Sequence, residues 1–158
     1  MSTYIKPFAV RPEEGLKLQT PTAGSVVVKA NTHQTGAALT VLEFLIPPND
    51  GPAVHSHIRE DEVWYVIEGE FRFMAGDAML RASTGGMAFG PRGIPHAFQN
   101  VGDALGRLLV ITTPSGLERF FEETDALPRP IDLEEVAAIG RANWMDFSGP
   151  PLGISDPL

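Results

Sequence analysis

Two histidines and a glutamate near the middle of the chain have the spacing of metal ligands. His55 and His57 are two residues apart, and Glu62 directly precedes a run of β-branched and aromatic residues, 63–67. Residues two apart in an extended strand point to the same side, so both imidazoles can face one space. Imidazoles and carboxylates together bind divalent transition metals. These residues therefore predict a chelating metal site, with the carboxylate beside the histidine pair.

A third histidine, His96, lies in another stretch rich in turn residues, 85–100. Glycines and prolines there require tight turns and place His96 at the start of a short strand. Together the two stretches resemble the two motifs of the cupin superfamily, G(X)5HXH(X)3,4E(X)6G and G(X)5PXG(X)2H(X)3N. The matching residues are His55, His57, Glu62 and Gly69 in the first motif, and Gly85, Pro91, Gly93, His96 and Asn100 in the second.

The first motif departs from the family pattern at one position. Asn49 stands where the motif opens with glycine, and Gly51 comes later, with three residues between it and His55. Asparagine adopts left-handed backbone conformations more readily than most residues, so we expect the turn to form. The departure therefore leaves the ligand assignment unchanged.

The resemblance implies an all-β fold, the small antiparallel barrel called a double-stranded β-helix or jelly roll. It also implies a metal cofactor bound by His55, His57, Glu62 and His96. These mixed nitrogen and oxygen ligands suit Fe, Mn, Ni, Co or Zn, and raw affinity does not choose among them in a cell. Four protein ligands on a metal that accepts five or six leave positions for water, dioxygen or substrate.

Cupins with such a site carry out dioxygen chemistry, isomerisation or decarboxylation, or no reaction at all, so the motifs predict a site and not a reaction. The enzymes that this chain most resembles are the quercetin-dioxygenase-like cupins, which have the same four-residue spacer before the glutamate. In that class the metal activates a flavonol or enediol, and the glutamate can accept the substrate proton. On this resemblance, Glu62 is the candidate catalytic base.

Composition limits the class of protein. The chain has 158 residues, 43% hydrophobic and 20% charged, as is typical of one globular domain. Its formal net charge of -8 disfavours nucleic acid as a partner. The absence of cysteine excludes disulfides, thiolate metal sites and cysteine nucleophiles. No apolar run approaches a membrane span and the N-terminus lacks a signal-peptide layout, so we expect no membrane partner and a cytoplasmic location.

The order of elements divides the chain into three parts. Residues 1–24 contain several prolines and form an N-terminal arm, which we expect to pack on the barrel or on a second subunit. Short strand-like segments separated by turn residues fill 25–113 and predict the cupin barrel. Residues 114–158 form a small C-terminal helical extension and tail that pack on the barrel.

Two helices are expected in the C-terminal part. A capping box of Ser115 and Glu118 predicts a helix over about 116–124. A second helix begins at Asp132, since apolar residues follow it at helical spacing. The tail from Trp144 onward has no clear period, and we expect it to be irregular.

Residues that alternate with the ligands are candidates for the wall of a substrate pocket. Counting in twos from Glu62 gives Trp64 and Val66, and counting from His96 gives Phe98. These three side chains are expected on the ligand side of their strands.

Further apolar residues lie in the neighbouring barrel strands, among them Met74, Met87 and Phe89. With them the cavity could be apolar and suit an aromatic or alkyl-bearing substrate. The alternative is that inward residues of any small barrel are large and apolar for packing alone.

Two other residues compete for a place in the site. Glu60 has the same strand parity as Glu62, but the spacer and the position of Gly69 favour Glu62 as the ligand, and we expect Glu60 to be solvated. His33, the remaining histidine, lies in a polar, turn-rich segment, and we expect no role for it.

The sequence thus favours a metal-dependent cupin enzyme, most nearly a dioxygenase acting on a small organic molecule. The alternatives are a cupin that binds a metal or small molecule without reaction, and a cupin isomerase or decarboxylase. A small-molecule substrate is the expected partner, and a homodimer is possible because small cupins commonly dimerise.

Overall fold

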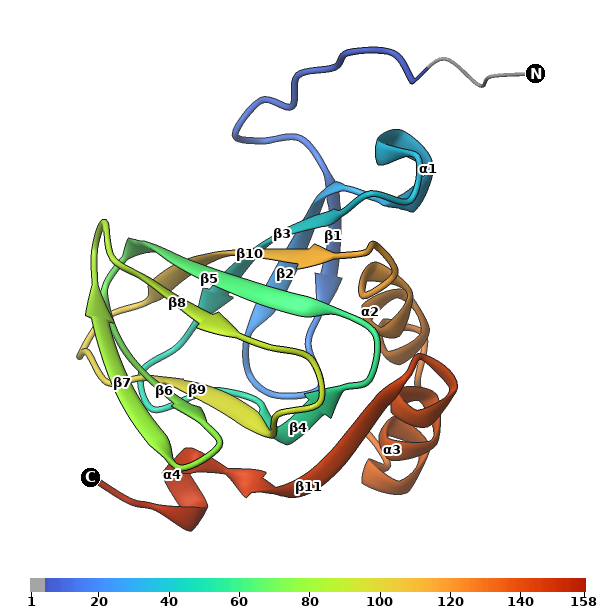
Figure 1. Ribbon diagram of the computed structural model, residues 1–158. Helices are drawn as coiled ribbons and strands as arrows, with labels where there is room; N and C mark the ends of the chain where they lie inside the picture. The colour runs from blue at the N-terminus through green and yellow to red at the C-terminus, as the bar shows by residue number, and fades with distance from the viewer. Residues whose placement is uncertain (1–4) are drawn as a thin grey trace.

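Two antiparallel β-sheets packed face to face make up most of the computed structural model, which describes residues 5–158 (Figure 1). The strand order is β1-β2-β3-β10-β5-β8 in the six-stranded sheet and β11-β4-β9-β6-β7 in the five-stranded sheet. This arrangement confirms the predicted double-stranded β-helix. The strands are β1 (Leu16–Gln19), β2 (Ser25–Ala30), β3 (Thr40–Ile46), β4 (Ala53–His57), β5 (Asp61–Glu68), β6 (Glu70–Ala75), β7 (Ala78–Ser83), β8 (Met87–Gly90), β9 (His96–Asn100), β10 (Gly106–Thr113) and β11 (Met145–Pro151).

Alternation of side chains along the strands builds the core between the two sheets. In β2, β3 and β10 every second residue is buried, as expected for strands with one face toward a core. The largest fully buried side chains include Trp64 on β5 and Phe71 and Phe73 on β6. This packing holds the inner face of each sheet at a fixed distance from the other, which is what a site built from both sheets requires.

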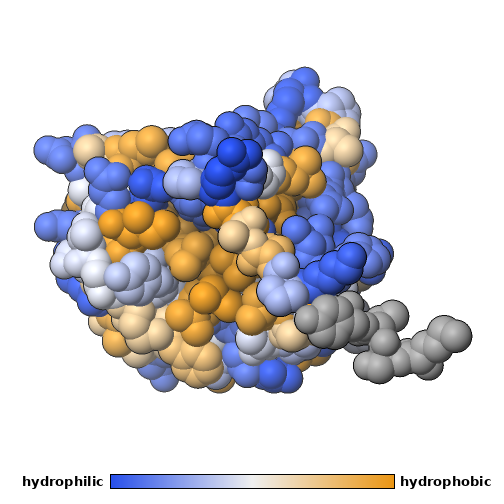
Figure 2. Space-filling model, turned by 90° about the horizontal axis from the view of Figure 1, so that it is seen from above, coloured by the Kyte–Doolittle hydropathy of each residue, from blue (hydrophilic) through white to orange (hydrophobic). Residues whose placement is uncertain are grey.

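The outer face of the six-stranded sheet is also rich in apolar side chains. Figure 2 shows them gathered in the middle of the face seen from above. Tyr65 on β5 and Met87 and Phe89 on β8 are 43%, 54% and 49% exposed, so Met87 and Phe89 point away from the barrel interior. The expectation that they lie near the cavity is therefore wrong.

Helices α2 (Glu118–Asp125) and α3 (Leu133–Ala142) cover one end of the barrel (Figure 1). The first C-terminal helix begins at Glu118, later than predicted, and Leu117 at its N-cap makes no side-chain cap. The Ser115 hydroxyl is buried without a hydrogen-bond partner, and Glu118 instead accepts hydrogen bonds from Thr32 and Thr40. The predicted capping box is therefore wrong. The helices are α1 (Thr32–Thr35), α2 (Glu118–Asp125), α3 (Leu133–Ala142) and α4 (Leu152–Ser155).

Helix α3 agrees with the prediction, since Asp132 caps it by accepting a hydrogen bond from the Glu134 backbone N–H. The expectation of an irregular tail is wrong. The tail contains β11, which pairs with β4 and adds an edge strand to the five-stranded sheet (Figure 1). β11 has proline and glycine at its end, which conceals the strand pattern in the sequence.

The N-terminal arm also differs in part from the prediction. Residues 16–19 form β1 and pair with β2 at the edge of the six-stranded sheet, so the arm ends inside the barrel fold. The first part of the predicted arm, residues 1–4, lies outside the described residues. In the part of the chain that the structure describes, no helix is long and apolar enough to cross a membrane.

Candidate metal centre

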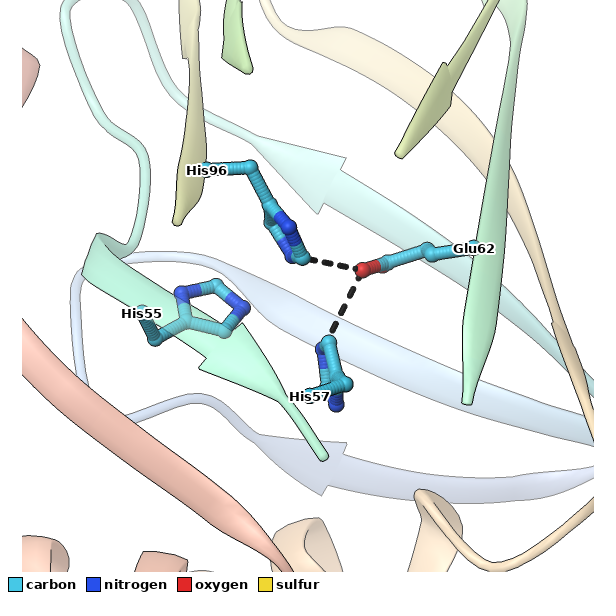
Figure 3. Close-up of side chains that lie close together, drawn as sticks. All are labelled: His55, His57, Glu62 and His96. Atoms are coloured by element: carbon cyan, nitrogen blue, oxygen red, sulfur yellow. Dashed lines mark ion pairs between the residues drawn. The ribbon is translucent and has the colours of Figure 1, made fainter. Parts of the chain in front are cut away.

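The four predicted ligands lie together between the sheets, and Figure 3 shows their side chains converging. His55 and His57 come from β4 and His96 from the adjacent β9, where His96 is the register partner of His55. Glu62 comes from β5 in the opposite sheet. All four side chains are buried. The two sheets of the barrel thus bring together residues that are up to 41 positions apart, from His55 to His96.

The donor atoms have the arrangement that a metal requires. The Glu62 Oε2 atom lies 3.1 Å from His57 Nε2 and 3.0 Å from His96 Nε2, without satisfying either nitrogen in hydrogen-bond geometry. One ligand atom from each of the four residues lies within 4.8 Å of the others. Two ligands on opposite sides of a metal, with bonds of about 2.1 Å, would be about 4.2 Å apart. The cluster is therefore close to the size of a coordination sphere and could hold a divalent metal.

The protonation of the cluster also suits metal binding. Burial lowers the pKa of His55 to about 3, and the neighbouring His96 and His57 act in the same direction. Burial alone would raise the pKa of Glu62, but the imidazoles of His57 and His96 against its carboxylate lower it below its ordinary value. At neutral pH the site therefore offers a neutral imidazole and an ionised carboxylate, the forms that bind metals.

The outward ring nitrogens of the histidines determine which nitrogen can face the metal. His55 Nδ1 lies 2.7 Å from the backbone carbonyl oxygen of Ala53, and His96 Nδ1 lies 3.0 Å from that of Ile94. A donating Nδ1–H on each ring leaves Nε2 free to bind, as is common in metal sites. His57 is held differently, because its Nδ1 faces a carboxylate.

That carboxylate is Glu60, which is buried, so the expectation that it is solvated is wrong. Its Oε2 lies 3.8 Å from His57 Nδ1, and neither atom has a hydrogen-bond partner. The separation is longer than a hydrogen bond, and closing it requires a shift of less than about 1 Å. Buried carboxylates that accept from a ligand histidine orient the ring and make it more basic. Sequence parity alone does not show this contact, because the chain turns between β4 and β5.

Replacement of Glu60 by alanine is expected to weaken metal binding about 10- to 100-fold, because it removes the buried carboxylate that faces His57 Nδ1 at 3.8 Å and can orient the ring. Glu60→Gln keeps an acceptor oxygen and is expected to restore part of the affinity. Titration with Mn(II), followed by electron paramagnetic resonance, measures the Mn(II) dissociation constant of each variant.

The matched control is Glu118→Gln, which alters another buried carboxylate that hydrogen-bonds to Thr32 and Thr40 instead of facing a ligand. It should bind Mn(II) as tightly as the unaltered chain. Unchanged Mn(II) affinity in Glu60→Ala would show that Glu60 does not support His57.

A cavity of about 460 Å³ leads to the cluster, and His55, His57 and Glu62 form part of its wall. Among the three predicted pocket residues, Phe98 lines this cavity. Trp64 and Val66 are fully buried in the core and lie outside the wall. The Trp64 ring instead packs edge-on against His96, with ring centroids 5.1 Å apart. It therefore helps to hold the His96 imidazole in place.

The C-terminal part supplies a wall that the sequence prediction missed. Phe147 on β11 lies with its ring centroid 5.7 Å from that of His55, and also packs against Phe120 of α2. A Cβ on Gly140 of α3 would lie 2.8 Å from the Phe147 ring, so this glycine allows the close packing. The apolar spacing along α2 and α3 was the available signal, but it does not reveal which strand the helices face.

The remaining motif residues shape the backbone around the ligands. Asn49 has φ +64°, which confirms the expected left-handed turn. Gly51 follows where the chain passes Phe98 so closely that a Cβ would lie 1.9 Å from the Phe98 carbonyl oxygen. The buried Asn100 side chain donates to the carbonyl oxygens of Ile46 and Ala104. Gly51 thus brings the segment before β4 close to β9, and Asn100 attaches β9 to the end of β3.

Comparison with known proteins agrees with this geometry. Residues 42–112 match a family model described as a cupin domain, and this segment contains both motifs. This segment of the chain is therefore a cupin domain. An uncharacterized protein of Methanocaldococcus jannaschii is 22% identical over 79 residues, covering 50% of this chain and 63% of that protein, which is less than two thirds of its length.

Solved structures with the same fold have different described activities. A predicted oxalate decarboxylase from Thermotoga maritima is 18% identical with a TM-score of 0.62, and the match covers 68% of this chain and 99% of that one. The polyketide cyclase RemF from Streptomyces resistomycificus is 22% identical with a TM-score of 0.60, covering 70% and 81%. At these identities the likeness establishes the fold, and the reaction has to be argued from the site.

Proposed function

We propose that this cupin is a metal-dependent enzyme of the dioxygenase type that acts on a small organic substrate. The observation that carries the proposal is the position of the four-residue cluster, buried at the wall of a cavity large enough for a small molecule. With four protein ligands, a metal that accepts five or six would retain open coordination positions, and His55, His57 and Glu62 line that cavity.

The chain's own residues have separable roles in this proposal. His55, His57, Glu62 and His96 would hold the metal, which when bound supplies Lewis acidity and, for a redox-active ion, electron transfer. Glu62 is ionised and lines the cavity, so it can accept the proton of a substrate hydroxyl. The apolar side chains around the cavity exclude bulk water from the reacting end of the substrate.

A second candidate, a cupin that binds its ligand without reaction, is favoured by one observation. Among the described residues that line the cavity, Asp50 is the only ionisable group besides His55, His57 and Glu62, and it already accepts a hydrogen bond from Thr22. Apart from Asp50, the described part of the wall therefore has no acid or base that is not a proposed metal ligand. A cupin isomerase or decarboxylase would need such a group for proton transfer, which makes that alternative weaker.

Oxygen consumption tests the proposed reaction. Fe(II), Mn(II) and Ni(II) forms are incubated with flavonols and with enediols, and at least one form is expected to consume oxygen in proportion to substrate. Glu62→Gln, assayed at matched metal content, should lose about 100-fold or more of that rate. Tight binding of these compounds with no oxygen uptake by any of the three metal forms would instead favour the non-enzymatic candidate.

The cytoplasmic location and the homodimer remain predictions of the sequence.

A further inference from the structure

Five phenylalanine rings, from both the barrel and the C-terminal part, line the cavity. The rings contact one another edge-on, with centroids 5.3 Å apart for Phe44 and Phe121 and 5.1 Å apart for Phe120 and Phe121. Phe98 and Phe147 extend the same wall to the metal ligands. Rings that pack on one another in this way form a rigid, preformed surface for a flat apolar molecule.

The few polar groups of the wall are already committed to one another. The Thr22 hydroxyl donates to the Asp50 carboxylate at 3.0 Å, and the Thr20 hydroxyl donates to the Gly24 carbonyl oxygen at 2.8 Å. No lysine or arginine is found among the described residues that line the cavity. Arg129 approaches the same loop, but it donates to the Thr20 carbonyl oxygen and is not part of the wall. A phosphate or second carboxylate on the substrate would therefore be desolvated without a partner, which is costly.

The entrance of the cavity is apolar as well. Leu133 of α3 and Ile154 of α4 line the cavity and yet are 74% and 70% exposed, so they mark where it opens to solvent. Pro21 and Pro150 line the cavity with them. An exposed leucine alone carries no information. Two such residues, from separate helices that line the same cavity, make its solvent-facing part apolar.

We propose that the substrate is an uncharged, largely apolar ring compound that reaches the four ligands with one oxygen-bearing end. This inference rests on the proposed function for the role of the metal, and adds the class of molecule that the site selects. The metal-binding end needs one or two oxygen donors, such as a hydroxyl beside a carbonyl. The body of the molecule lies between the phenylalanine rings and displaces water from them.

Two compounds with one shared head group test this selection. Maltol and 3-hydroxyflavone carry the same 3-hydroxy-4-pyranone end, and only the flavone adds two apolar rings. Calorimetric titration of the Zn(II)-loaded protein is expected to give roughly tenfold or tighter binding for 3-hydroxyflavone. Oxalate, a small dianion, should bind more weakly than 3-hydroxyflavone. Equal affinity for the two pyranones, or tightest binding of oxalate, would overturn the proposal.

Variants of the wall complete the experiment. Phe147→Ala should weaken 3-hydroxyflavone binding about fivefold more than maltol binding, because this ring would contact the apolar rings that only the flavone carries. Leu133→Ser is a second wall variant that should not disturb folding, because this side chain is exposed. It should reduce the preference for 3-hydroxyflavone over maltol about twofold. Leu105→Ser, at a half-exposed leucine outside the wall, is the matched control and should have no effect. An unchanged preference in both Phe147→Ala and Leu133→Ser would contradict the proposed wall.

The two proposals fail in different ways. Zn(II) has no redox chemistry, so these affinities do not depend on turnover. Selective flavone binding without oxygen uptake by the Fe(II), Mn(II) or Ni(II) forms would remove the dioxygenase and keep the substrate class. Oxygen uptake with small polar enediols, together with equal affinity for the two pyranones, would keep the dioxygenase and remove the substrate class.

Discussion

Replacement of His57 by alanine is expected to abolish stoichiometric metal binding and to leave the fold in place. The imidazole is buried, and its Nε2 lies 3.1 Å from the Glu62 carboxylate, in the centre of the cluster. Without it, three ligands remain, and the space left joins the existing cavity, because His57 already lines it. Metal content is measured by elemental analysis after dialysis, and the fold by circular dichroism and thermal unfolding.

The matched control is His33→Ala. His33 is exposed and is the one histidine of the chain outside the cluster. This variant removes the same side chain and should keep the full metal content. If His57→Ala, once shown to be folded, retained the metal content of the unaltered chain, the ligand assignment would be wrong.

Replacement of Gly51 by alanine is expected to cost more than about 4 kcal/mol in the free energy of unfolding. A Cβ at this position would lie 1.9 Å from the Phe98 carbonyl oxygen, and the neighbouring atoms are backbone, which cannot rotate away. Relief requires β9 to move, and β9 carries His96, so metal affinity should fall with stability. Urea unfolding of the metal-free protein gives the stability change without a contribution from binding.

Gly85→Ala measures the stability cost of backbone strain without the cost of a close contact. Gly85 has φ +86°, but a Cβ there would have no neighbour within 4 Å, so only conformational strain of about 1–2 kcal/mol is expected. A cost for Gly51→Ala no larger than that for Gly85→Ala would show that β4 and β9 are not held together at this point.

The parts of the site that depend on local spacing could be predicted from the sequence. The i, i+2 spacing of His55 and His57 requires only an extended strand, and β4 provides it. Asn49 could be assigned its turn because left-handed backbone is a property of the residue itself. The barrel followed from the motifs and from the succession of short strands, since each strand carries its own pattern.

The parts that depend on long-range pairing could not be predicted. β11 pairs with β4 across nearly 90 residues of chain, and its sequence, with a glycine and two prolines, gives no strand signal. Phe147 therefore became part of the cavity wall without any local indication. Trp64 had the correct parity, but the space in front of it is filled by His96 and Phe73, a packing fact that alternation does not contain.

Glu60 illustrates the same limit at the site itself. A glutamate next to an aspartate and an arginine is typical of a solvated turn, yet this one is buried against His57. Whether the Glu60 or the Asp61 carboxylate faces inward depends on how the chain turns between β4 and β5. Asp61, its neighbour, turns outward and pairs with Arg92 instead.

Elemental analysis of the protein purified from its native host tests the central claim most directly. The account predicts about one divalent transition-metal ion per chain, bound by His55, His57, Glu62 and His96 and absent from folded His57→Ala. Protein that is purified without metal, and that takes up none of Fe(II), Mn(II), Ni(II), Co(II) or Zn(II) when each is supplied, would contradict it.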